Sequence, residues 1–196
     1  IDVHNGDWFE DLKPFIYSVG NAAPEVVAKA EEMAAKADVP FYVKSGIGTG
    51  GAYNYAGTLG IPSVLIERGC KGQWSEEEAE ASRKDVRNIL RYLGVLTTEP
   101  EPQTQTPVHM RHAHYVDSVN EGCWHPFKNA GDEVKKGECI GVLKDYFGNV
   151  IEEVRMREDA VILYQTISYS VPADSPLIAY GHYDSCIEKE NQDPQE

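Results

Sequence analysis

The spacing of the apolar positions changes near the middle of the chain. Before residue 97, short apolar runs alternate with stretches in which apolar residues recur at helical spacing. The runs predict strands at residues 1–4, 40–44 and 61–66, and the repeats predict helices at 24–37 and 75–93 and one or two helical turns at 52–59. This alternation is typical of an α/β layer with a largely parallel sheet, in which residues 1–4 form the end of a buried strand.

Local signals support the two longer helices. Pro24 suits the first turn of a helix, where its missing N–H costs no hydrogen bond. Ser75 is followed three residues later by Glu78, which is the spacing of a capping box, and Gly94 follows the last apolar position of the repeat. The second long helix is therefore expected to begin after Ser75 and to end before Gly94.

A proline-containing segment separates this half of the chain from the next. Residues 97–107 contain three prolines and no large apolar side chain, which is typical of a linker. After it, short apolar runs are separated by Gly, Asn and Asp turns, and the strand cores fall at 134, 140–143, 150–154, 161–164 and 177–180. We expect an α/β part at 1–96, a linker at 97–107, an all-β domain at 108–187 and a disordered acidic tail at 188–196.

Composition excludes several classes of partner. The 196 residues include 32 acidic and 18 basic side chains, for a net charge of −14, which argues against nucleic acid or an anionic membrane as a partner. The four cysteines are far apart and form no Cys-x-x-Cys pair, which favours free thiols in a reducing compartment and a cytoplasmic protein. Because the first residues already read as a core strand, we expect the chain to be a piece of a longer protein.

Two polar residues follow apolar strands at positions where ligands bind in α/β sheets. His4 ends the first predicted strand and Glu67 follows the third, 63 positions later. A neutral imidazole binds zinc, and a neighbouring carboxylate such as Asp2 can hold its other ring nitrogen. A glutamate beside an activated water can transfer its proton. These residues alone leave two other interpretations open. His4 could have a structural role, and Glu67 could form an ion pair with Arg68 or a lysine.

Longer stretches resemble one family. Residues 1–6 (Ile-Asp-Val-His-Asn-Gly) resemble the strand that carries the third zinc ligand in the succinylglutamate desuccinylase/aspartoacylase family, which is related to the zinc carboxypeptidases. Residues 60–69 resemble the strand with its catalytic glutamate, 74–94 the helix after it, and 122–127, 130–141 and 145–149 its C-terminal β domain. The resemblance implies a partial zinc-carboxypeptidase-like α/β sheet domain, followed by a small all-β barrel or sandwich-like domain related to biotinyl and lipoyl folds.

The resemblance also implies a function. The expected activity is zinc-dependent hydrolysis of an amide bond in an N-acyl amino acid or small peptide, in a protein compatible with a homo-oligomer. His4 would be a metal ligand, Asp2 the partner of its ring, and Glu67 the catalytic acid/base. The family's other two zinc ligands, a His and a Glu three residues apart, precede this strand, so the chain would supply one ligand of three. The alternatives are a non-catalytic binding or assembly module on a degenerate scaffold, and a zinc carboxypeptidase.

Further residues have two interpretations each. Arg68 could neutralise a substrate carboxylate or fix Glu67. Tyr53 and Tyr55, after the glycine-rich residues 46–51, could hydrogen-bond a substrate or serve in packing. The role of Cys70, just past the Glu67 strand, stays open.

The β half holds two features that bear on other functions. The histidines could form a second metal site or belong to a polar strand, with two of them on one strand face; they are His109, His112, His114 and His125. The stretch 154–160, where a swinging-arm domain would carry its modified lysine, has no lysine. This argues against lipoylation or biotinylation.

Overall fold

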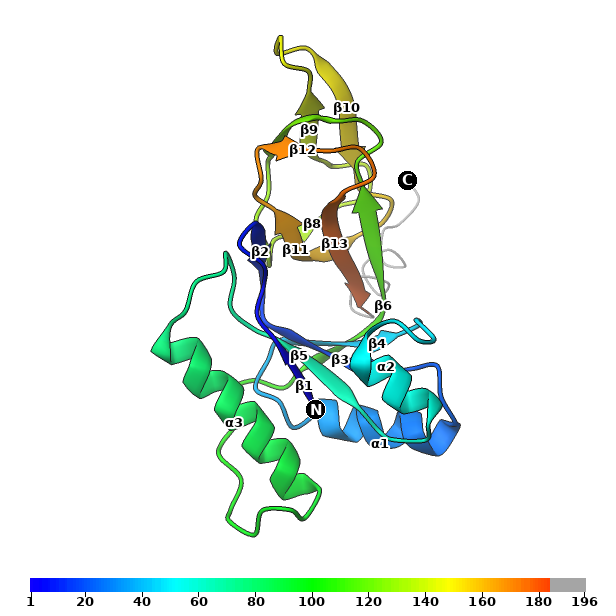
Figure 1. The fold of residues 1–196 in the computed structure, drawn as a ribbon, viewed down its shortest axis with the longest axis vertical. Helices are drawn as coiled ribbons and strands as arrows, with labels where there is room; N and C mark the ends of the chain where they lie inside the picture. The colour runs from blue at the N-terminus through cyan, green and yellow to red at the C-terminus, as the bar shows by residue number, and fades with distance from the viewer. Residues whose placement is uncertain (184–196) are drawn as a thin grey trace, which may run out of the picture. The chain divides into compact units, whose positions relative to one another are not determined.

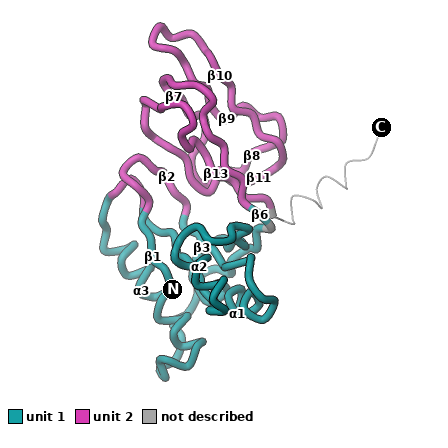
Figure 2. Tube along the Cα trace, turned by 45° about the vertical axis from the view of Figure 1, so that its right-hand side comes forward, with its two compact units in different colours: residues 1–5, 14–69, 73–112 teal, residues 6–13, 70–72, 113–196 magenta. Residues whose placement is uncertain are grey.

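The computed structural model describes residues 1–183, and packing divides them into two compact units (Figure 2). The first unit contains residues 1–5, 14–69 and 73–112, and the second contains 6–13, 70–72 and the residues from 113 onward. Strand β6 (Val108–Asp117) begins in the first unit and continues into the second. The predicted tail at 188–196 lies outside the described residues, and the predicted domain boundaries stay predictions.

The first unit contains a mixed sheet covered by helices (Figure 1). Its strand order is β1 (Asp2–His4), β5 (Val64–Glu67), β3 (Phe15–Val19), β4 (Phe41–Ser45) and the start of β6. The pairs β1–β5, β3–β4 and β4–β6 are parallel, whereas β3 and β5 are antiparallel. The predicted α/β architecture is therefore confirmed as a mixed α/β sheet. The sheet is largely parallel, as expected, except for the antiparallel pair β3–β5.

Two strands of this sheet differ from what the sequence predicts. All five residues of β3 are buried, yet no element was predicted there, because so short an apolar run is not distinctive by itself. β1 was predicted to be a buried strand, and this is wrong for the described residues: Ile1 is 42% and Val3 is 49% exposed. The reason is that β1 is the edge strand of this sheet and pairs with β5.

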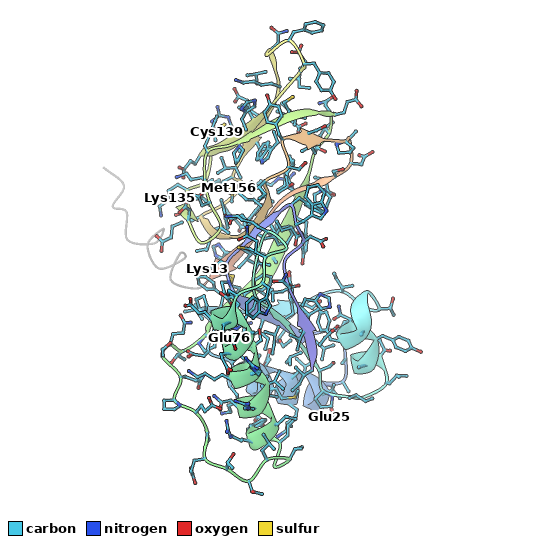
Figure 3. The ribbon with its side chains drawn as sticks, turned by 60° about the vertical axis from the view of Figure 1, so that its left-hand side comes forward. Lys13, Glu25, Glu76, Lys135, Cys139 and Met156 are labelled. Carbon is cyan, nitrogen blue, oxygen red and sulfur yellow. The ribbon has the colours of Figure 1, made fainter. Side chains whose placement is uncertain are left out.

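Three helices complete the first unit: α1 (Pro24–Ala34), α2 (Gly51–Thr58) and α3 (Glu76–Tyr92). The side chains of α1 and α3 meet those of β3 and β5 in one apolar core, where Met33, Ile16, Ile66 and Ile89 are almost fully buried. Figure 3 labels Glu25 and Glu76 in the first turns of α1 and α3, where an acidic side chain is favourable to the helix dipole.

The structure agrees with the predicted ends of α3 but not with the predicted end of α1. The α3 prediction is confirmed, since the Ser75 hydroxyl accepts a hydrogen bond from the Glu78 amide at 3.1 Å and Gly94 adopts a positive φ of 73°. The predicted end of α1 at residue 37 is wrong. After Ala34 the backbone tightens into three-residue turns, with the amide of Ala37 bonded to the carbonyl of Ala34.

The second unit is built from two antiparallel sheets. One has β11 (Ala160–Thr166) between β13 (Pro176–Tyr183) and β2 (Glu10–Leu12), with β8 (Glu133–Val134) also paired to β11. The other has the order β10 (Val150–Arg155), β9 (Cys139–Lys144), β7 (Gly122–Pro126) and β12 (Ser170–Val171). Side chains from both sheets, such as Trp124 and Ile162, share one apolar core. The predicted all-β character of this half is confirmed as antiparallel sheet.

The predicted linker is held in place by one buried carboxylate. Asp38 is 8% exposed and accepts hydrogen bonds from the backbone amides of Thr104 and Gln105, at 2.8 and 3.1 Å. Lys84 of α3 lies 2.6 Å from the other oxygen of Asp38. Residues 97–107 therefore contain no helix or strand, as their prolines indicate, but they pack as part of the first unit.

Acid should loosen this attachment. Burial would raise the pKa of Asp38, but the hydrogen bonds from Lys84, Thr104 and Gln105 outweigh it and hold the pKa below its ordinary value of 3.8. The stabilisation is therefore complete above about pH 4 and is lost as the pH falls through the lowered pKa. We expect the free energy of unfolding of Asp38→Asn, measured with urea from neutral to acidic pH, to fall less with acid than that of the wild type. Equal losses in the two proteins would contradict this.

Across the described residues, no helix combines the length and the apolar character that a membrane crossing requires.

Candidate functional site

The two residues singled out from the sequence lie side by side in the first unit. β1 and β5 are parallel and pair in a register that sets His4 directly beside Glu67. Each residue is the last of its strand, so both stand at the same edge of the sheet, where the carboxyl ends of these two strands meet. The imidazole Nδ1 of His4 lies 3.8 Å from Oε1 of Glu67. The pairing of β1 with β5 thus brings together two residues that are 63 positions apart in the sequence.

The second nitrogen of the His4 ring faces another carboxylate. Nε2 of His4 is 3.3 Å from Oδ1 of Asp2, two residues earlier on the same face of β1. The side chain of His4 is half exposed at 49%, while those of Asp2 and Glu67 are 24% and 18% exposed. A partly buried carboxylate on each side of the ring thus limits how the imidazole can turn while leaving it open to solvent.

A glycine allows the chain to approach the site closely. Gly69, two residues after Glu67, has a φ of 74°, and a Cβ built there would lie 1.9 Å from the side-chain oxygen of Asn5. No other residue fits that space or that backbone conformation without displacing Asn5. The amide of Arg68 also bonds to the carbonyl of His4 at 3.3 Å. These contacts hold the residues after β1 against those after β5.

Arg68 is buried away from solvent in an ion pair. Its Nε donates to Oδ2 of Asp85 at 2.6 Å and its terminal nitrogen donates to the carbonyl of Asp38 at 2.8 Å. Asp85, on α3, is fully buried, and Glu78 of the same helix lies 3.5 Å from the guanidinium. This arrangement joins the end of β5 to α3, and a contact of Arg68 with substrate stays a prediction.

The two tyrosines of α2 have different environments. Tyr53 is buried and stacks on Tyr17 of β3, with ring centroids 6.0 Å apart, and its carbonyl accepts a hydrogen bond from Ser63. Tyr55 is 57% exposed. Tyr53 is therefore packed inside the first unit, in agreement with the packing interpretation. A substrate contact of either residue stays a prediction, as does any role of the half-buried free thiol of Cys70.

The donor atoms at this site suit one part of a zinc centre. An imidazole flanked by a carboxylate on its other ring nitrogen is a common zinc ligand with its supporting partner. Within residues 1–183, however, His4, Asp2 and Glu67 do not form a group of three atoms close enough to hold an ion alone. The donor set present here therefore fits one ligand of a zinc site, and the role of His4 as that ligand stays a prediction.

A second group of candidate ligands lies along β6. One ligand atom from each of His112, His114 and Glu158 lies within 4.8 Å of the others, so this group could hold a metal ion. The sequence indicated His112 and His114 on one strand face, and they do converge. His109 and His125 do not belong to the group: His109 stacks on Tyr42 with ring centroids 4.6 Å apart, and His125 packs edge-on against Tyr169.

Two of these features have no clear signal in the sequence. The close approach of Gly69 to Asn5 follows from a backbone conformation that only the fold reveals, although a glycine two residues after a candidate catalytic residue was a visible signal. Glu158 is contributed by a loop 44 residues after His114, and no spacing rule connects it to the His-x-His pair.

Comparison with solved structures shows which proteins share this fold. The product-bound ectoine utilization protein EutE (DoeB) from Ruegeria pomeroyi aligns with a TM-score of 0.80 at 20% identity, over 92% of this chain and 56% of that one. A succinylglutamate desuccinylase/aspartoacylase from Rhodobacter sphaeroides aligns with a TM-score of 0.78 at 22% identity, over 93% and 57%. An aspartoacylase family protein from Mesorhizobium loti gives 0.70 at 18%, over 93% and 57%.

The predicted resemblance is therefore confirmed at the level of the fold. This chain spans little more than half the length of the structures that it matches. No protein-family model matches the sequence, and no curated protein matches it either. At these identities the structural likeness establishes the architecture, and the activity has to be argued from the site.

Proposed function

We propose that this chain is part of a zinc-dependent hydrolase that cleaves the amide bond of an N-acyl amino acid or a related small carboxylate. The observation that carries the proposal is the direct pairing of His4 and Glu67 at the carboxyl ends of two parallel strands. The fold supports it, because it is shared with structures described as succinylglutamate desuccinylase and aspartoacylase proteins. The ligands that complete the zinc site would come from the part of the full-length protein outside this chain.

The residues present have distinct roles in this proposal. His4 would bind the metal through its imidazole, and Asp2 would hold the ring in one orientation and tautomer. Bound zinc supplies Lewis acidity, which polarises the amide carbonyl and lowers the pKa of a water molecule at the site. The β1–β5 register sets His4 beside Glu67, and Gly69 and Asn5 keep the chain after Glu67 close to the chain after His4.

Glu67 would move the proton. Its carboxylate, 18% exposed, accepts a proton from the attacking water as the new C–O bond forms. It then donates that proton to the amide nitrogen as the C–N bond breaks. The products are a carboxylic acid and an amine, and Glu67 returns to its starting state.

Metal analysis with a substrate screen tests the proposal. In the full-length protein, we expect His4→Ala to lower the zinc content by one equivalent per chain and to abolish hydrolysis of the N-acyl amino acid that the wild type cleaves. The matched control is His125→Ala, on β7 of the second unit, which should leave both quantities unchanged. Zinc content and hydrolysis would be measured by elemental analysis and by amine release.

The remaining outcomes discriminate between the functions. Cleavage of C-terminal peptide bonds in place of N-acyl amino acids would assign a carboxypeptidase. A full-length protein without zinc and without hydrolytic activity would assign a non-catalytic binding or assembly module. Full activity in His4→Ala would contradict a role of this histidine in the metal site.

A further inference from the structure

Two histidines on β6 are arranged as a chelating pair. His112 and His114 are two residues apart on one strand, which directs both side chains to the same face at a spacing of roughly 6–7 Å along the backbone. The ring of His114 lies against the buried ring of Tyr180 on β13, with centroids 5.3 Å apart. This packing restricts the orientation of one imidazole before any metal is bound.

A carboxylate from another part of the fold completes the group. Glu158 lies in the loop between β10 and β11, and its Oε1 is 3.0 Å from Nε2 of His114. Ligands around a tetrahedral zinc, at about 2 Å from the ion, are roughly 3.3 Å apart. The His114–Glu158 pair therefore already has the required separation, and His112 lies within 4.8 Å of both ligand atoms.

The loop that carries Glu158 is fixed by its neighbours. Nδ1 of His182 lies 2.8 Å from the carbonyl of Asp159 and 3.6 Å from Oε2 of Glu158. The carboxylate of Asp159 binds the ammonium of Lys135 at 2.6 Å and the amide of Lys136 at 2.8 Å. Figure 3 labels Lys135 and Met156 in this part of the second unit. A ligand-bearing loop held in this way loses little conformational freedom on binding an ion.

The chemistry of the donors selects the ion. We propose that His112, His114 and Glu158 form a binding site for zinc or a similar divalent first-row transition metal, with ligands other than His4 and Glu67. Two imidazoles and one carboxylate suit such an ion, whereas calcium and magnesium prefer all-oxygen sites. His114 is exposed and the other two side chains are half-buried, so an ion can enter from solvent. The proposal is independent of the proposed hydrolytic function.

Metal titration of the 196-residue chain tests this site. The chain should carry His4→Ala, so that the other candidate ligand cannot contribute. We expect it to bind zinc, to shift its thermal midpoint upward with zinc and to return to the metal-free value with a chelator. Cobalt(II) should give visible d–d absorption with imidazole ligation.

Two variants in the same background identify the ligands. His114→Ala and Glu158→Gln should each weaken zinc binding by at least roughly tenfold, and His125→Ala, on β7, should leave it unchanged. The far-UV circular dichroism and the metal-free thermal midpoint show whether each variant is folded. Calorimetry that finds no zinc binding, or binding equally strong in folded His114→Ala and Glu158→Gln chains, would overturn the proposal.

Discussion

In the full-length protein, Glu67→Gln should lower kcat for amide hydrolysis by roughly 10²–10⁴-fold, the usual contribution of a general acid/base. The amide side chain of glutamine has nearly the same size but cannot accept the proton of the attacking water. Because Glu67 is proposed to transfer a proton while His4 binds the metal, the zinc content should stay at the wild-type value. Steady-state kinetics with elemental analysis of the same preparations measure both quantities.

The matched control is Glu153→Gln, which removes an exposed glutamate carboxylate in β10 that pairs with Arg155. Its kcat should equal that of the wild type. Unchanged turnover in Glu67→Gln would refute the catalytic assignment. Loss of zinc from that variant would instead make Glu67 a ligand, since the 3.8 Å separation from the His4 ring is short enough for both to reach one ion.

Arg68→Ala should lower the free energy of unfolding by about 3–5 kcal/mol, because it leaves a charge in the interior without its partner. Asp85 is fully buried, and the guanidinium of Arg68 is its charged neighbour at 2.6 Å. Urea denaturation of the wild type and the variant gives the difference. The control is Arg83→Ala, whose exposed ion pairs with Glu76 and Glu80 on α3 should contribute less than about 1 kcal/mol.

The same variant also separates the two interpretations of Arg68. If the side chain fixes Glu67 by joining the end of β5 to α3, kinetics of the folded full-length variant should show little change in KM. A large rise in KM with wild-type stability would instead assign Arg68 to a substrate carboxylate. A change in neither quantity would contradict both interpretations.

Where a sequence signal is local, the structure agrees with it. The start of α3 follows from Ser75 and Glu78, because a cap depends on residues three positions apart and on little else. Its end at Gly94 depends on a backbone conformation that glycine adopts readily. The His-x-His pair of β6 also converges as its spacing predicts, because alternate residues of any strand share a face.

Where an element depends on its partners, the sequence alone does not predict it. Glu10–Leu12 has no strand character of its own, and it forms β2 only because β11 provides a partner in register. Phe15–Val19 is the fully buried strand between β5 and β4, but its five residues give no periodicity to detect. The antiparallel pairing of β3 with β5 likewise depends on how the chain returns, which residue types do not encode locally.

The candidate site shows the same distinction between local signals and features that depend on tertiary contacts. The sequence by itself determined that His4 and Glu67 end apolar strands and that a carboxylate stands two residues from the histidine, since these are properties of short segments. Only the tertiary structure decided that β1 and β5 are parallel neighbours in a register that joins the two residues, and that Arg68 turns to Asp85 on α3. Pairing and burial depend on contacts between segments far apart in the chain, and those contacts exist only once the sheet and its helices have assembled.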